Sequence, residues 1–123
     1  GLVHAFDASG RTNVGHALET AVANELERRG AEVGYVSTAN GFEVDFLARR
    51  PGVEPELLQV CADVSSAETL DRKLRALPAA AVELGGARQR LLVLDRDDRA
   101  AARAPGVEVV PAYEWLLEEV PSA

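Results

Sequence analysis

The spacing of apolar positions near the start of the chain predicts a helix over residues 14–29. Its apolar residues recur every four positions, at Val14, Leu18, Val22 and Leu26. Asn13 is expected to cap the start of this helix, and Gly30 is a good terminator. Glu25 and Arg29 fall beside the apolar stripe, an unusual position for charged side chains.

Three runs with strand character follow the first helix, at residues 32–38, 42–48 and 56–62. Asn40-Gly41 predicts a hairpin between the first two runs, and residues 49–55 predict a turn. The last run is almost continuously apolar, as in a central strand. In the middle run strict alternation places two sets of side chains on opposite faces. These sets are Phe42, Val44, Phe46 and Ala48 against Glu43, Asp45 and Leu47.

A second helix is predicted over residues 67–84. Ser65 or Ser66 is expected to cap it, and Glu68 has the spacing of a capping box with Ser65. Pro78 is expected to kink or split the helix, and Gly85-Gly86 to end it.

The rest of the chain predicts two strands, at residues 89–94 and 107–110, joined by a loop or short helix over 95–105. Pro111 is expected to begin a terminal helix that Tyr113 and Trp115 dock onto the sheet. The element order α-β-β-β-α-β-β-α predicts an α/β fold with a mixed sheet and helices on both faces.

Composition narrows the class of protein. The chain has 123 residues, enough for one domain, and a net charge of -7. A single cysteine excludes a disulfide framework, and no apolar run reaches the length of a membrane span. We expect a cytoplasmic protein, and the abrupt start without methionine suggests a fragment of a longer chain. So acidic a chain is not a general nucleic-acid-coating protein, although a local basic patch would still allow contact.

One set of polar residues has the pattern of a metal site. Glu19 lies on the first predicted helix and Asp45 on the second strand, while Gln59 and Cys61 share a face of the third strand. Oxygen ligands from a helix and a neighbouring strand suit Mg²⁺ or Mn²⁺, which activates water toward a phosphodiester. An alternative interpretation is that Glu19 is an ordinary exposed helix residue. Asp45 would then share a solvent-facing edge of its strand with Glu43.

These residues carry a family resemblance. The segments Leu18–Gly30 and Gly41–Leu47, with the order α-β-β-β-α-β, resemble PD-(D/E)XK proteins of the restriction-endonuclease-like fold. More narrowly, GHALET, ELERRG, GFEVDFLAR, LLQVCADVSSAET and LDR resemble the C-terminal domain of unknown function of bacterial and archaeal AAA+ ATPases. The resemblance covers roughly Gly15 to Trp115. It implies an upstream ATPase module in the same chain.

The resemblance implies a role for each matching residue. Glu19 matches the helix glutamate, Asp45 the metal-binding aspartate, Gln59 the (D/E) position and Cys61 the lysine position. Gln59 still offers a carbonyl oxygen, but a cysteine supplies no positive charge and is more typical of a core. A cation from the second helix, Lys73 or Arg72, is a candidate replacement.

Arg49, Arg50 and Arg72 are candidate contacts for a nucleic-acid backbone, although arginines at strand ends and on helix faces are commonly just solvated. Three functions remain open at this stage. The first is a degenerate nuclease-like binding or regulatory module of an AAA+ ATPase, in contact with DNA, RNA or a protein. The second is an active Mg²⁺-dependent nuclease that uses Glu19, Asp45 and Gln59. The third is a structural or oligomerisation domain.

Overall fold

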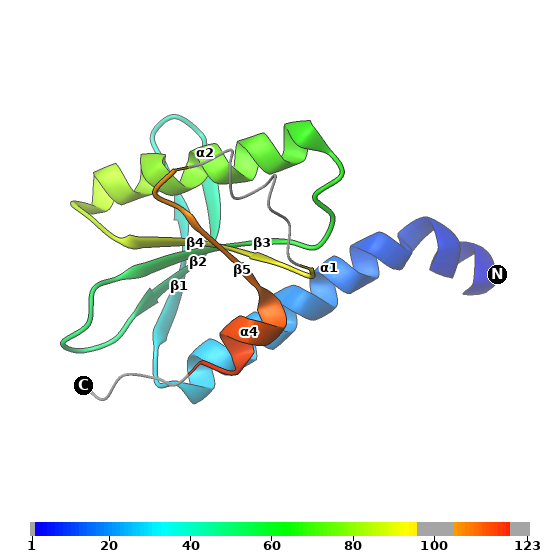
Figure 1. Ribbon diagram of the computed structural model, residues 1–123, viewed down its shortest axis with the longest axis horizontal. Helices are drawn as coiled ribbons and strands as arrows, with labels where there is room; N and C mark the ends of the chain where they lie inside the picture. The colour runs from blue at the N-terminus through cyan, green and yellow to red at the C-terminus, as the bar shows by residue number, and fades with distance from the viewer. Residues whose placement is uncertain (1, 96–104, 119–123) are drawn as a thin grey trace.

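A five-stranded mixed sheet with helices on both faces forms the molecule (Figure 1). The computed structural model describes residues 2–95 and 105–118, with side chains from residue 14 onward. Its elements follow the predicted order: α1 (Leu2–Arg28), β1 (Glu32–Ser37), β2 (Glu43–Arg49), β3 (Glu56–Cys61), α2 (Ala67–Leu84), β4 (Arg88–Val93), β5 (Glu108–Pro111) and α4 (Ala112–Leu116). Most of the loop or short helix expected at 95–105 lies outside the described residues. None of the described helices is long and apolar enough to cross a membrane.

The strands lie side by side in chain order, so β3 occupies the centre of the sheet. β1, β2 and β3 pair antiparallel, whereas β3, β4 and β5 pair parallel. The connection from β3 to β4 runs through α2, as a parallel pair requires. Figure 1 shows α2 over one face and α1 with α4 over the other.

Helix α1 begins well before the predicted start. It runs from Leu2, so Asn13 lies within the helix and does not cap it. Residues 2–12 contain no proline, and their one glycine, Gly10, costs only about 1 kcal/mol of helix stability, so nothing there stops the helix. Leu18, Val22 and Leu26 are buried as expected, but Val14 is exposed. Gly30, with φ +79°, ends the helix as predicted.

A β-bulge in β2 breaks the predicted alternation. Gly34 pairs with Leu47 and Val36 with Val44, so two residues of β2, Asp45 and Phe46, stand opposite one residue of β1. The extra residue changes the face on which the following side chains lie. The side chains split into Phe42, Val44 and Leu47 toward α2 and Phe46 and Ala48 toward α1.

Helix α2 has the predicted bounds but not the predicted capping box. Ser66 is the N-cap, and its hydroxyl accepts a hydrogen bond from the backbone N–H of Thr69, whereas Ser65 bonds to Asp63. The helix continues unbroken through Pro78. At its end, Gly85 and Gly86 take positive φ angles and donate to the last carbonyls, which terminates the helix where expected.

Trp115 docks α4 onto the sheet, whereas Tyr113 does not. Trp115 is completely buried in the core beneath α1, together with Leu26 and Leu58. Tyr113 is 53% exposed, which corrects the expectation that both aromatic residues pack inward. The five-residue helix α4 presents alternate faces to core and solvent, so only one of the two faces the sheet.

Replacing Trp115 should therefore be far more damaging than replacing Tyr113. Trp115→Ala is expected to lower the free energy of unfolding by about 3–5 kcal/mol, because it leaves a large cavity under α1. Tyr113→Ala should change it by no more than about 0.5 kcal/mol. Urea unfolding followed by circular dichroism measures both. Equal losses in the two variants would contradict this packing.

Candidate functional site

Asp45 and Gln59 join β2 to β3 where their backbone pairing ends. The ladder between the two strands stops at Phe46 and Leu58. Beyond it, the backbone N–H of Asp45 donates to Gln59 Oε1 at 2.9 Å, and the N–H of Val60 donates to Asp45 Oδ2 at 2.9 Å. Each side chain thus replaces a backbone acceptor on the opposite strand. Without this exchange, two N–H groups in the interior of the sheet would lack partners.

The amide of Gln59 is committed to backbone groups at both ends. Its Nε2 donates to the carbonyl oxygen of Glu43 at 2.9 Å and to that of Lys73 at 3.2 Å. The residue is only 1% exposed. One side chain therefore ties β3 to both β2 and α2, and its oxygen points at a backbone donor.

Lys73 is the cation that α2 brings to Asp45. Its Nζ lies 3.4 Å from Asp45 Oδ2, and the two side chains are 20% and 26% exposed. Lys73 is also the only lysine in the chain. The same carboxylate oxygen thus receives the ammonium and the N–H of Val60. The ion pair fixes α2 over the bulge in β2.

A small cavity of about 190 Å³ opens beside this ion pair, and we call it the Asp45 pocket. Its lining brings together four of the residues singled out from the sequence: Asp45, Gln59, Arg72 and Lys73. Gly41, Phe42 and Glu43 complete it. Two acidic and two basic residues line the pocket, so their formal charges cancel.

Other predicted site residues lie elsewhere. Glu19 is half-buried on α1, the helix that packs against the opposite face of the sheet from α2, and it does not line the Asp45 pocket. Arg49 is exposed at the far end of β2, and Arg50 lines a different cavity. Only Arg72, among the arginines proposed as nucleic-acid contacts, lies at the Asp45 pocket.

Cys61 is a core residue, as its apolar surroundings in the sequence indicated. It is 3% exposed and packs among Leu70, Leu74 and Leu91. Its Sγ donates to the carbonyl oxygen of Asp63 at 3.2 Å. Burial raises the pKa of the thiol, with Lys73 acting weakly in the other direction, so the thiolate form is disfavoured.

The donor set of the Asp45 pocket does not suit Mg²⁺ or Mn²⁺. Such ions need several free oxygen ligands. Gln59 Oε1 accepts from a backbone N–H, and Asp45 Oδ2 accepts from both a backbone N–H and an ammonium. The described residues contain no group of three or more His, Cys, Asp or Glu arranged to hold a metal.

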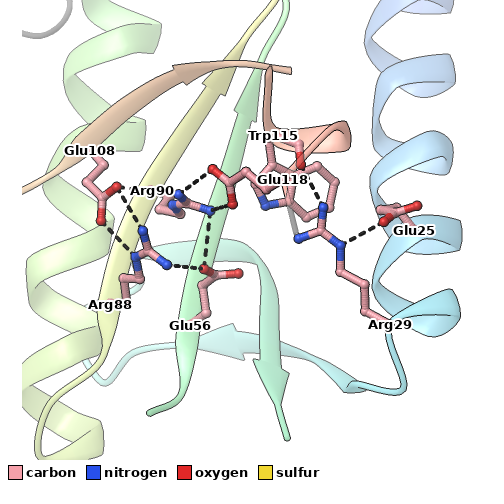
Figure 2. A network of polar contacts seen from close by, with 8 residues as sticks. All are labelled: Glu25, Arg29, Glu56, Arg88, Arg90, Glu108, Trp115 and Glu118. Carbon is pink, nitrogen blue, oxygen red and sulfur yellow. Dashed lines mark hydrogen bonds and ion pairs between the residues drawn. The ribbon is translucent and has the colours of Figure 1, made fainter. Parts of the chain in front are cut away.

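A second polar cluster lies at the other end of the sheet (Figure 2). Arg90, only 3% exposed, forks onto the carboxylate of Glu118 at 2.8 and 2.7 Å. Arg88 pairs with Glu108, and both arginines approach Glu56 within 3.7 Å. Burial raises the pKa of Glu56, although Arg90 and Arg88 oppose this shift.

Sequence reasoning missed Arg90 because its strand was identified by apolar residues. The available signal was its register, since Arg90 occupies the same face as Leu92 and therefore points into the core beneath α1. Arg29, by contrast, was marked by its place beside an apolar stripe. Its guanidinium lies 4.3 Å from the ring centre of Trp115 and donates to the carbonyl of that residue.

Glu25 binds two arginines on the last turns of α1. Its carboxylate accepts from Arg28 at 2.8 and 2.6 Å and from Arg29 at 2.7 Å. These bonds, that of Arg28 first, lower the pKa of Glu25 from 4.5 to about 2. Glu25 and Arg29 do lie beside the apolar stripe of α1, where they pair with each other.

Comparison with protein-family models, with curated proteins and with solved structures finds no match to this chain. The restriction-endonuclease-like core and the attached ATPase therefore stay predictions from the sequence.

Removing the Asp45 carboxylate should destabilise the sheet. Asp45→Ala leaves the buried N–H of Val60 and the ammonium of Lys73 without their partner, so the free energy of unfolding should fall by about 2–3 kcal/mol. Glu43→Ala, two residues away and exposed, should change it by no more than about 0.5 kcal/mol. Urea unfolding of the two variants measures the difference. An Asp45→Ala protein as stable as the Glu43→Ala protein would overturn the structural role of the carboxylate.

Acid should weaken the chain partly through Glu25. Because its folded pKa is below the unfolded value, its stabilising effect is complete above about pH 4.5 and is lost as the pH falls toward 2. The free energy of unfolding should fall by about 1–2 kcal/mol, since Arg28 is largely exposed and the surrounding water screens its interaction with Glu25.

Unfolding free energies at several pH values test this. Glu25→Gln should flatten the curve between pH 4.5 and 2, whereas Glu27→Gln, an exposed neighbour on α1, should leave its slope unchanged. If Glu25→Gln leaves the pH dependence of the free energy of unfolding unchanged, the pKa of Glu25 is not lowered in the folded chain.

Proposed function

We propose that this chain is a nuclease-like domain that does not cleave nucleic acid and acts as a binding or regulatory module of an AAA+ ATPase. The resemblance in the sequence motivates the family. The observed order of helices and strands, with Asp45 and Gln59 side by side on β2 and β3, supports it. The fold itself is α/β with a mixed five-stranded sheet.

One observation carries the absence of cleavage: the polar groups of the Asp45 pocket are used to hold the protein together. Lys73 and the N–H of Val60 occupy Asp45 Oδ2, while Gln59 makes three hydrogen bonds to backbone groups. A carboxylate and an amide engaged in this way serve as structural crosslinks among β2, β3 and α2. The whole Gln59 amide and Oδ2 of Asp45 are thereby used within the protein.

The distribution of charge favours a protein partner over a nucleic acid. The two acidic and two basic residues that line the Asp45 pocket balance each other, and Arg49 and Arg50 lie at the opposite end of β2. A phosphate backbone is attracted by clustered positive charge, which this face lacks. We therefore assign the binding role to contact with the ATPase module that the resemblance implies.

A metal-dependent nuclease is the second candidate, and one contact favours it. Lys73 lies close to Asp45 beside a cavity, which is where a replacement for the missing catalytic lysine is needed. For Lys73 to act in catalysis, its ion pair with Asp45 would have to open.

Cleavage assays distinguish the two candidates. The chain is incubated with single- and double-stranded DNA and RNA in the presence of Mg²⁺ or Mn²⁺, beside Asp45→Asn and Lys73→Met. We expect no product above a protein-free control for any of the three proteins. Products from the unmodified chain that disappear in Asp45→Asn would establish the nuclease instead.

A gel-shift assay at low salt tests the choice of partner. We expect no shift of DNA or RNA, because the pocket carries no excess of positive charge. A shift that Arg72→Gln abolishes and Arg28→Gln, on the last turn of α1, leaves intact would place a nucleic acid at the Asp45 pocket and contradict the choice of a protein partner.

A further inference from the structure

A second, larger cavity of about 430 Å³ lies at the end of the sheet where β3 and β4 begin, and we call it the arginine cavity. Four arginines line it: Arg29, Arg50, Arg88 and Arg90. It is distinct from the Asp45 pocket and shares no lining residue with it. Its volume is within the range of sites that hold small ligands.

Arg50 is the uncommitted cation of this cavity. It is half-buried, and within the part of the chain that the structure describes its guanidinium makes no hydrogen bond or ion pair, although its carbonyl accepts from the N–H of Val53. A guanidinium at a cavity that no protein group engages is available to an anionic acceptor there. A ligand acceptor in the cavity would satisfy it.

Unsatisfied donors also lie in the surrounding core. Arg90 Nε and Trp115 Nε1 are buried without a hydrogen-bond partner. Buried donors without partners are rare in folded proteins and call for an explanation. With Arg50, they make the region around the cavity rich in donors.

Glu118 shows that the guanidinium of Arg90 binds a carboxylate. Its carboxylate binds Arg90 through two parallel hydrogen bonds, the bidentate geometry that carboxylates and phosphates share. Glu118 follows α4, and its side chain is 32% exposed. The position of this partly exposed carboxylate on Arg90 is therefore one that another oxyanion could take.

Apolar residues form the other part of the lining, namely Leu26, Ala48 and Val53. They are suited to a ligand whose anionic group is attached to a hydrophobic body. Glu25 pairs with Arg29 and Glu108 with Arg88, so Arg50 and Arg90 are the cations that an anion in place of Glu118 would contact.

We propose that the arginine cavity binds a small ligand with an apolar body through a carboxylate or phosphate, which takes the place of Glu118 on Arg90 and also contacts Arg50. This site is independent of the proposed function, since none of its residues belongs to the Asp45 pocket.

Two probes test the site on the isotopically labelled chain by NMR titration at constant ionic strength. Benzoate offers a carboxylate on an apolar ring, and phenyl phosphate offers a phosphate on the same ring. At least one of them should shift the backbone amides of Arg50, Arg90 and Glu118 in a saturable way. Saturation by only one probe identifies the anionic group that the site prefers, whereas saturation by neither overturns the proposal.

Matched variants separate the site from diffuse charge. Arg50→Gln removes an uncommitted donor without breaking a contact, and it should weaken binding about tenfold, the effect of one charge-assisted hydrogen bond. Arg49→Gln, its exposed neighbour outside the cavity, should leave binding unchanged. Glu118→Gln removes the competing carboxylate and should tighten binding. Equal weakening by Arg49→Gln and Arg50→Gln, or weaker binding in Glu118→Gln, would contradict the site.

Discussion

Two backbone N–H groups, those of Asp45 and Val60, lose their strand partners where β2 diverges from β3. A buried N–H without an acceptor costs about 1–3 kcal/mol, so the chain must supply acceptors there. It supplies the side chains of Gln59 and Asp45. The positions of β2, β3 and α2 all depend on this exchange, because Lys73 completes it from the helix.

The bulge in β2 explains why such an exchange is needed. With Asp45 and Phe46 both opposite one residue of β1, the strand shifts its register and its side chains change faces. Phe46 then packs toward α1, while Val44 and Leu47 pack toward α2. The extra residue in β2 thus lets the strand contribute side chains to the core on each face of the sheet. It also places the Asp45 carboxylate at the Asp45 pocket. The same geometry that brings Asp45 and Gln59 to one pocket engages Asp45 Oδ2 and the Gln59 amide in bonds within the protein.

Periodicity predicted the order of elements and the bounds of α2 because those depend on local spacing and caps. It failed at β2, since strict alternation contains no information about an extra residue that only the pairing with β1 reveals. It also began α1 too late, after Asn13, because a residue that suits a cap does not start a helix when the preceding residues are helical too. Tyr113 was misplaced for a similar reason: the five-residue helix α4 directs only one of its two aromatic rings inward.

The candidate site was predictable in part. Motif positions indicated Asp45 and Gln59, the missing motif lysine indicated Lys73 as a replacement, and these three residues do meet. Motifs did not reveal that hydrogen bonds to the backbone occupy the Gln59 amide, because such bonds depend on where the strands part. Arg90 went unnoticed since a single arginine among leucines does not alter the apolar character of a strand. Its partner Glu118 lies 28 positions away in the sequence.

Asp45 and Gln59 crosslink β2, β3 and α2, and we propose that this is their role in place of holding a metal. Any ion that binds the folded chain and not the unfolded one raises the free energy of unfolding as its concentration increases. Urea unfolding at increasing Mn²⁺ concentration and constant ionic strength tests this most directly, with Mn²⁺-free buffer as the reference. We expect no dependence of the free energy of unfolding on Mn²⁺. A stabilisation that grows with the logarithm of Mn²⁺ concentration and vanishes in Asp45→Asn would contradict it.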